Sequence, residues 1–131
     1  MRVALLQINP TAGDIPGNSA MIVRAARQAR EMGADLAVTP ELALMGYLPR
    51  DLLMSHGFVT RSCQELTRMA GELAGGPPLL VGVATVNPAE MGRPLFNSAF
   101  LLKERKDLAF RFFTVQAGRR RQRGTRLPAG F

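Results

Sequence analysis

The sequence predicts an α/β fold, a mixed β-sheet with flanking helices, from three observations. Apolar runs typical of buried strands alternate with amphipathic helical segments in the order β-α-β-α-β-β-β. The last three strands are joined by short connections, which favours antiparallel pairing in that part of the sheet. The chain has 131 residues, 47% hydrophobic and 21% charged, which is enough for one domain with its own core.

The first strand and the first helix are separated by a loop. Residues 2–8 are an apolar run typical of a buried strand. Residues 9–17 contain two prolines and two glycines and are expected to form a loop. Asn18 or Ser19 is the expected N-cap of the helix that follows, whose apolar residues recur at helical spacing. Gly33 is expected to end this helix.

A second strand completes the first βαβ unit, and a second helix follows it. Residues 34–39 form the second predicted strand. Residues 49–53 begin with proline and predict a short helical turn. A longer helix is expected over residues 58–73, with Cys63 on its apolar face, and the Gly-Gly-Pro-Pro at residues 75–78 ends it.

The remaining predicted elements are strands. Residues 79–84 read as a fully buried strand, residues 95–103 as a fourth strand, and residues 107–113 as a fifth. After residue 113 the character changes, because residues 118–131 contain five arginines, three glycines and no acidic residue. We therefore expect two regions, a folded one over residues 1–113 and a basic tail over residues 114–131.

The most informative position is Glu41, which comes just after the strand at residues 34–39. Pro40 precedes it and Gly46-Tyr47 forms a turn after it. The carboxyl end of a buried strand is where open α/β sheets place their chemistry, so Glu41 is a candidate general base. The alternative is a carboxylate that caps the following turn through backbone N–H groups, and the residues alone leave both interpretations open.

Several short segments resemble the start of the nitrilase, or carbon–nitrogen hydrolase, superfamily. They are Ala4-Leu5-Leu6-Gln7-Ile8-Asn9-Pro10, Gly13-Asp14, Asn18, Thr39-Pro40-Glu41-Leu42, Gly46-Tyr47, Val81-Gly82-Val83 and Leu95-Phe96-Asn97-Ser98-Ala99. The segment Pro49-Arg50-Asp51-Leu52-Leu53 is similar to one in the N-terminal glutaminase domain of glutamine-dependent NAD synthetases. The resemblance covers about residues 1–112.

The resemblance implies the N-terminal part of an αββα sandwich that hydrolyses amides with a glutamate, a lysine and a cysteine. The cysteine thiolate attacks the carbonyl, the glutamate moves protons, and the lysine stabilises the oxyanion. In the synthetases the amide is glutamine, and the ammonia is used by a C-terminal domain to amidate deamido-NAD. ATP and Mg would belong to that domain, so no cofactor is expected in this chain.

Two residues carry over from the resemblance as site candidates. Glu41 is expected to act as general base and acid, and Tyr47 to line the substrate pocket or merely to pack the turn. Cys63 is rejected as the nucleophile because it lies on the apolar face of a predicted helix, where free cysteine is usually a small buried hydrophobe. His56 has no second ligand at metal spacing and is expected at the surface, so no metal site is predicted.

The chain departs from the family pattern near its end. The family lysine is expected near Phe113, but residues 111–115 read Arg-Phe-Phe-Thr-Val. The segment that bears the family cysteine has no match in the sequence. We therefore expect a truncated domain, inactive alone, with a disordered or frameshifted tail over residues 114–131. The alternative for the tail is a genuine basic segment that binds an acidic surface.

Composition excludes several other classes of protein. Residues 1–118 carry 12 Lys and Arg against 10 Asp and Glu, so the net charge of +7 comes mainly from the tail and does not indicate nucleic-acid binding. No apolar run is long enough to span a membrane, and a single cysteine with no signal peptide predicts a cytoplasmic protein.

Three hypotheses on function and assembly stay open beside the glutaminase fragment. The chain is alternatively a fragment of a free-standing carbon–nitrogen hydrolase, or a non-catalytic module that pairs with a full-length relative through its sheet. A homo-oligomer is the third.

Overall fold

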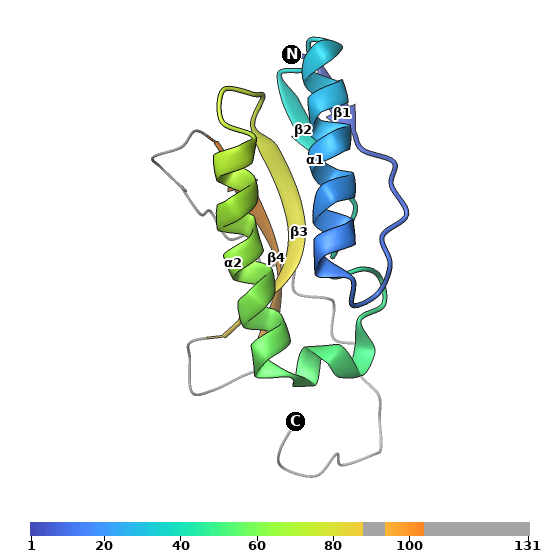
Figure 1. Cartoon of the computed structure of the whole chain (residues 1–131), viewed down its shortest axis with the longest axis vertical. Helices are drawn as coiled ribbons and strands as arrows, with labels where there is room; N and C mark the ends of the chain where they lie inside the picture. Colours follow the sequence, from blue (N-terminus) through green and yellow to red (C-terminus); the bar gives the residue numbers. More distant parts are fainter. Residues whose placement is uncertain (88–93, 104–131) are drawn as a thin grey trace, which may run out of the picture.

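The computed structural model of the chain describes residues 1–87 and 94–103, which form a four-stranded sheet and two long helices (Figure 1). In chain order the elements are β1 (Val3–Leu5), α1 (Ile15–Glu31), β2 (Leu36–Val38), the 3-10 helix η1 (Arg50–Met54), α2 (His56–Glu72), β3 (Leu79–Val86) and β4 (Leu95–Leu102). The predicted α/β class and the short helical turn after Pro49 are confirmed.

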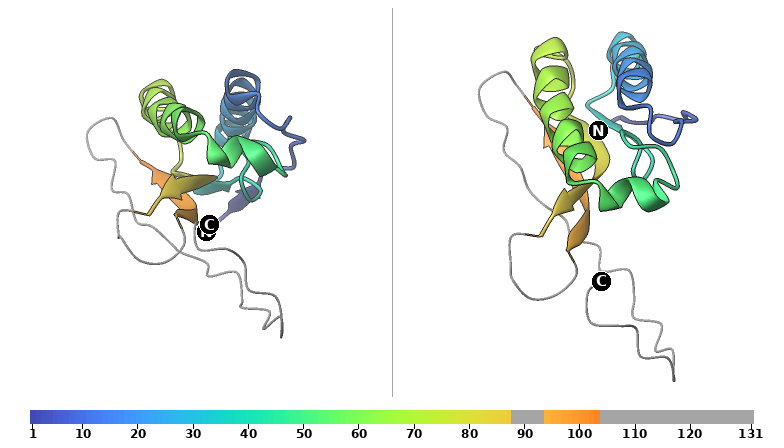
Figure 2. Two further views of the ribbon diagram at one scale, coloured as in Figure 1. Left: turned by 90° about the horizontal axis from the view of Figure 1, so that it is seen from below. Right: turned by 60° about the horizontal axis from the view of Figure 1, so that its bottom comes forward.

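The sheet is mixed, as predicted. Its strand order is β1-β2-β3-β4, with parallel pairing from β1 to β3 and antiparallel pairing between β3 and β4. The two parallel connections run through α1 and α2, and both helices lie on the same face of the sheet (Figure 2). The described residues thus form one layer of helices on one sheet, which corresponds to half of an αββα sandwich.

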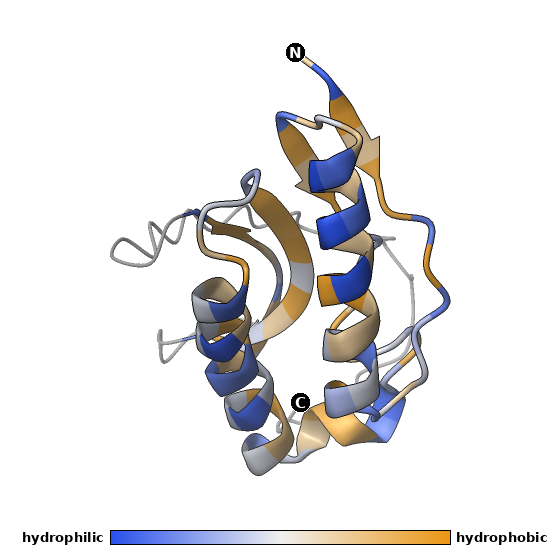
Figure 3. Cartoon of the chain, turned by 45° about the horizontal axis from the view of Figure 1, so that its top comes forward, coloured by the Kyte–Doolittle hydropathy of each residue, from blue (hydrophilic) through white to orange (hydrophobic). Residues whose placement is uncertain are grey.

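The two faces of the sheet follow from the strand register. One row crosses all four strands and is covered by the helices: Ala4, Ala37, Leu79 and Leu102. The next row points to the opposite side, which we call the open face: Leu5, Val38, Leu80 and Leu101. Leu5 is 71% exposed there. The strands are strongly apolar (Figure 3), so this second row is a hydrophobic surface on which no described helix packs.

The first helix begins earlier than predicted. Its N-cap is Asp14, whose Oδ1 accepts a hydrogen bond of 2.9 Å from the backbone N–H of Gly17. Asn18 and Ser19 were expected to cap the helix, and this prediction is wrong because both lie inside it and are buried. Pro16 suggested a loop, but proline is well tolerated in the first turn of a helix, where its missing N–H has no partner to lose.

The second helix is rotated slightly from its predicted orientation. It begins at His56, a residue expected in the preceding connection. Ser62 is completely buried, with its hydroxyl donating to the carbonyl of Phe58, whereas Cys63 is only half-buried. A small serine can be buried on a helix when its hydroxyl donates to the preceding turn. A prediction from hydrophobicity alone therefore placed Cys63, and not Ser62, on the buried face.

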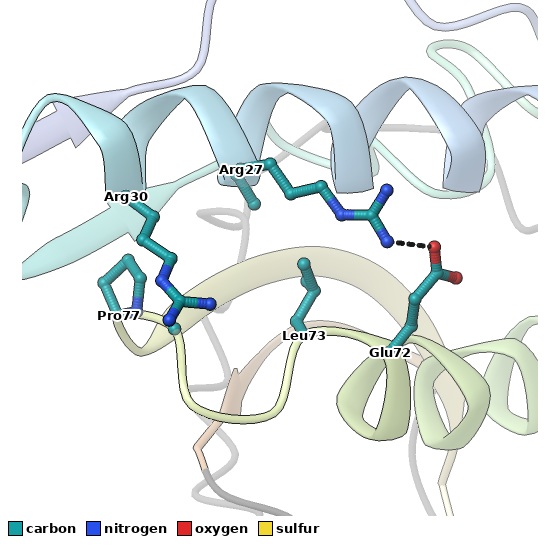
Figure 4. Close-up of a pocket in the computed structure, with 7 residues that line it drawn as sticks. Arg27, Arg30, Glu72, Leu73 and Pro77 are labelled. Atoms are coloured by element: carbon teal, nitrogen blue, oxygen red, sulfur yellow. Dashed lines mark hydrogen bonds and ion pairs between the residues drawn. The ribbon is translucent and has the colours of Figure 1, made fainter.

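A chain of ionic contacts joins the two helices on their outer side. The guanidinium of Arg27 on α1 lies 2.8 Å from the carboxylate of Glu72 on α2 (Figure 4). Arg68 reaches the same carboxylate at 2.6 Å and also donates to the buried hydroxyl of Ser19 on α1 at 2.9 Å. These contacts link α1 and α2 where the two helices lie side by side on the sheet.

The predicted strands match best in the second half of the described chain. β3 and β4 lie where strands were expected at residues 79–84 and 95–103. The expected strands at residues 2–8 and 34–39 are observed only as three-residue strands. The predicted fifth strand at residues 107–113, the tail at 114–131 and the place near Phe113 where the family lysine was expected lie outside the described residues.

Candidate functional site

The segment after β2, residues 39–47, places Glu41 on the open face of the sheet. There its side chain borders a cavity of about 330 Å³. The cavity is lined by Thr39, Pro40, Glu41, Leu80, Gly82, Asn97, Ser98 and Ala99, from the end of β2 and from β3 and β4. Glu41 therefore lies where the sequence predicted chemistry, just past the carboxyl end of a strand and beside a cavity.

Thr39 and Gly82 seat this segment against β3. The backbone N–H of Thr39 donates to the carbonyl of Leu80 at 2.9 Å, which extends the β2–β3 ladder by one residue. The hydroxyl of Thr39 then accepts a hydrogen bond of 3.1 Å from the N–H of Gly82, so a side-chain oxygen takes the place of a backbone carbonyl. A Cβ at Gly82 would lie 2.7 Å from backbone atoms of residues 40 and 42. Only glycine lets the segment approach this closely.

The rest of the segment is equally constrained. The N–H of Leu44 donates to the carbonyl of Gly82 at 3.4 Å, and the N–H of Gly46 to the carbonyl of Leu42 at 2.9 Å. Gly46 has a φ of +78°, and a Cβ there would lie 2.3 Å from the carbonyl oxygen of Thr11. Leu42, next to Glu41, adopts a φ of +50°, a left-handed conformation that residues other than glycine rarely adopt.

Asn18 on α1 ties the segment to the body of the domain. It is 1% exposed, and its side-chain amide makes three hydrogen bonds. Its Oδ1 accepts from the N–H of Thr11 at 2.8 Å, and its Nδ2 donates to the carbonyls of Thr11 at 2.8 Å and Leu44 at 3.2 Å. One buried side chain thus joins a helix, the loop after β1 and the segment that carries Glu41.

The carboxylate of Glu41 is exposed and has one described hydrogen-bond partner. Nδ2 of Asn97 on β4 donates to its Oε1. The alternative role of Glu41 as a cap is disfavoured, because the N–H groups of Leu44, Met45 and Gly46 all donate to backbone carbonyls instead. Sequence reasoning gave Asn97 no role, and its only signal was its position in a segment that resembles the family.

The other candidates lie apart from this cavity. Tyr47 is 61% exposed and is not among the residues that line the cavity, so its role in substrate binding stays a prediction. Cys63 and His56 are on α2, which covers the opposite face of the sheet. Burial raises the pKa of the Cys63 thiol, and a protonated thiol is a poor nucleophile, which agrees with its rejection.

Within residues 1–87 and 94–103, no three His, Cys, Asp or Glu side chains come together in a way that suits a metal ion. None of the described helices has the length and apolar character needed to cross a bilayer.

The family follows from comparison with known sequences. The model of the carbon-nitrogen hydrolase family matches residues 2–127, nearly the whole chain. The chain therefore belongs to the carbon–nitrogen hydrolase family. Because this match passes residue 113 without marking a change there, the division at that residue stays a prediction.

Curated relatives narrow the resemblance. The chain is 44% identical over 107 residues to the glutamine-dependent NAD(+) synthetase of Synechocystis, and 43% identical over 105 residues to that of Thermotoga maritima. These matches take up 78% and 79% of this chain but only 19% and 17% of the relatives. The chain thus corresponds to a fragment of their carbon–nitrogen hydrolase region.

Solved structures show the same fold. The glutamine-dependent NAD+ synthetase of Acinetobacter baumannii, in complex with ADP, superposes with a TM-score of 0.72 at 29% identity, over 86% of this chain and 20% of its own. An amidase from Nesterenkonia superposes with a TM-score of 0.61 at 29% identity, over 77% of this chain and 37% of its own. The helix-covered sheet is thus shared by an NAD synthetase and an amidase.

Proposed function

We propose that this chain forms the glutamate-bearing part of a glutamine-hydrolysing site, as in a glutamine-dependent NAD synthetase. The observation that carries the proposal is the position of Glu41, held by Asn97 beside a cavity of about 330 Å³ on the open face. The relatives are glutamine-dependent NAD synthetases, and their dependence on glutamine supplies the substrate class. The ATP-using step would lie outside the region of such an enzyme that matches this chain.

In this reaction Glu41 would act on protons only. Its carboxylate takes the proton of a cysteine thiol while the sulfur attacks the amide carbon and the carbonyl electrons move onto oxygen. When the tetrahedral intermediate collapses, the C–N bond breaks and the same carboxyl group gives the proton to the leaving ammonia. Water then attacks the thioester carbon while Glu41 takes its proton, and the C–S bond breaks as Glu41 returns that proton to the sulfur, which releases glutamate.

The nucleophile must come from outside the described site. Cys63 is the one cysteine in the sequence, and it lies on the helix-covered side with a raised pKa. The Nesterenkonia amidase has an active-site cysteine that acrylamide modifies, which supports a thiol route in proteins of this fold. We therefore expect residues 1–131 alone to release no ammonia from glutamine.

A chimera tests the proposal directly. In the Synechocystis synthetase, the segment that aligns with this chain would be replaced by residues 1–103, which include the whole of β4. We expect the rate of ammonia release from glutamine to lie within about tenfold of the parent rate. A loss of that size is expected because, at 44% identity, side chains on the open face have to repack against the rest of the synthetase. A folded chimera that makes NAD from free ammonia but hydrolyses no glutamine would reject the proposal.

A second candidate substrate class is a simple amide, favoured by the structural likeness to the Nesterenkonia amidase. The same chimera separates the two. Glutaminase parentage predicts that kcat/KM for glutamine exceeds that for acetamide, and the reverse order would favour the amidase.

A further inference from the structure

The hydrogen-bond partner of Glu41 comes from a distant strand. Asn97 is 56 residues further along the chain and pairs with Ala84 across the β3–β4 ladder. Because β3 lies between β2 and β4, the contact between Asn97 and Glu41 has to cross β3. Gly82 on β3 keeps that space free, since a Cβ there would lie 3.1 Å from the carbonyl carbon of Glu41.

Only one member of this pair, Glu41, can exchange a proton. A side-chain amide N–H donates a hydrogen bond but neither takes up nor releases a proton near neutral pH. It therefore fixes Oε1 of Glu41 without competing for the proton that the carboxylate has to carry. Within residues 1–87 and 94–103, Asn97 is the single hydrogen-bond partner of this carboxylate, which leaves Oε2 for the reaction.

We propose that Asn97 is a positioning residue, which holds Oε1 of Glu41 so that Oε2 is the oxygen that accepts and returns the proton. This inference rests on the proposed amide hydrolysis. A free glutamate side chain samples several rotamers, and a base that must meet a thiol within hydrogen-bond distance gains rate when one rotamer is selected. The Glu41–Asn97 contact across Gly82 selects that rotamer before any substrate binds.

Nuclear magnetic resonance of the 131-residue chain tests the contact without any turnover. The wild type should show a through-space cross-peak between the Asn97 Nδ2 protons and the Glu41 γ protons. Asn97→Asp keeps the size of the side chain and removes the donor, and Asn97→Ala removes the whole group. In both variants we expect the cross-peak to vanish and the Glu41 Cδ signal at neutral pH to shift.

Thr85→Ala is the control on the neighbouring strand β3. Thr85 is buried and does not line the cavity, and its hydroxyl lies 2.8 Å from that of Ser98. Its loss should lower the urea midpoint of unfolding and leave the Glu41 signals unchanged, because it changes stability and not the carboxylate. Glu41 signals that are identical in the wild type and both Asn97 variants, or that move equally in Thr85→Ala, would overturn the proposal.

Kinetics in the glutaminase chimera separate this inference from the proposed function. Asn97→Asp should lower kcat for glutamine hydrolysis by about ten- to a hundredfold, with KM within about twofold. An unchanged kcat would overturn the positioning role even if the contact exists. A chimera with no hydrolysis at all would reject the proposed function, while the resonance signals would still decide whether Asn97 holds Glu41.

Discussion

Replacing Asn18 by alanine is the sharpest test of how the site is held. The side chain is almost completely buried, and it satisfies the N–H of Thr11 and the carbonyls of Thr11 and Leu44. Alanine leaves all three backbone groups without that partner. A buried polar group that loses its partner costs about 1–3 kcal/mol, and groups near the surface cost less because water can replace the bond.

Two of the three groups belong to the half-buried loop at Thr11 and one is the buried carbonyl of Leu44. Counting the loop groups at the low end, we expect Asn18→Ala to lower the free energy of unfolding by about 2–4 kcal/mol. Urea denaturation followed by circular dichroism measures this change. Asn9→Ala is the control, since Asn9 is exposed in the same loop, and it should stay within about 0.5 kcal/mol of the wild type.

Asn18→Asp sharpens the test because it preserves size and removes the two donated hydrogen bonds. Its carboxylate would face the carbonyl oxygens of Thr11 and Leu44. We expect a loss of stability at least as large as that of Asn18→Ala. A loss below about 0.5 kcal/mol for either variant, equal to that of Asn9→Ala, would refute the claim that this residue fastens the Glu41 segment.

Other substitutions and conditions test further parts of the structure. Gly82→Ala puts a Cβ 2.7 Å from backbone atoms and should cost about 2–4 kcal/mol by urea denaturation. Gly71 lies on α2, where an added Cβ would meet no other atom, so Gly71→Ala should raise the free energy of unfolding by about 0.5–1 kcal/mol. Cys63 should react with iodoacetamide at pH 7.5 more slowly than free cysteine, because burial raises its pKa; equal rates would contradict this. Partial burial opposes ionisation of Glu65, but hydrogen bonds from Arg68 and Ser19 outweigh it and lower the pKa. This contribution to stability should persist above pH 4.5 and be lost as the pH falls below it, and Glu65→Gln should flatten that part of the pH–stability profile.

The sequence predicted correctly those helices and strands that are marked by a continuous or periodic run of apolar residues. Residues 79–84 are a continuous apolar run between breakers, and β3 covers them. The run was expected to be fully buried, but Leu80 and Gly82 face the open side of the sheet and are only half-buried. The start of α1 was missed because Pro16 and Gly17 look like loop residues, although the cap at Asp14 accommodates both. Helix boundaries depend on one or two hydrogen bonds, which composition does not encode.

The site was predicted only as far as one position. Glu41 stood out because it follows a strand and lies in a segment that resembles the family. Asn97 and Gly82 act through contacts across the sheet, and the interaction of Asn18 with Leu44 spans 26 residues. Such pairs depend on strand order and register, which a single sequence leaves open.

The residues that form the open face could be assigned only from the structure. The strand register was needed to align Leu5, Val38, Leu80 and Leu101 in one row. An apolar row of this kind on a sheet is a surface that other protein atoms normally cover. The half-site around Glu41 lies on that same face, so whatever covers the sheet would also form the opposite wall of the cavity.

The most direct measurement compares two nitrogen donors in the chimera that carries residues 1–103, with and without Glu41→Gln. If Glu41 moves the proton, the substitution should lower the glutamine-dependent rate by about 10²- to 10⁴-fold and leave synthesis from free ammonia unchanged. Glutamine-dependent synthesis that survives Glu41→Gln at the parent rate would contradict the assignment of this carboxylate to the chemistry.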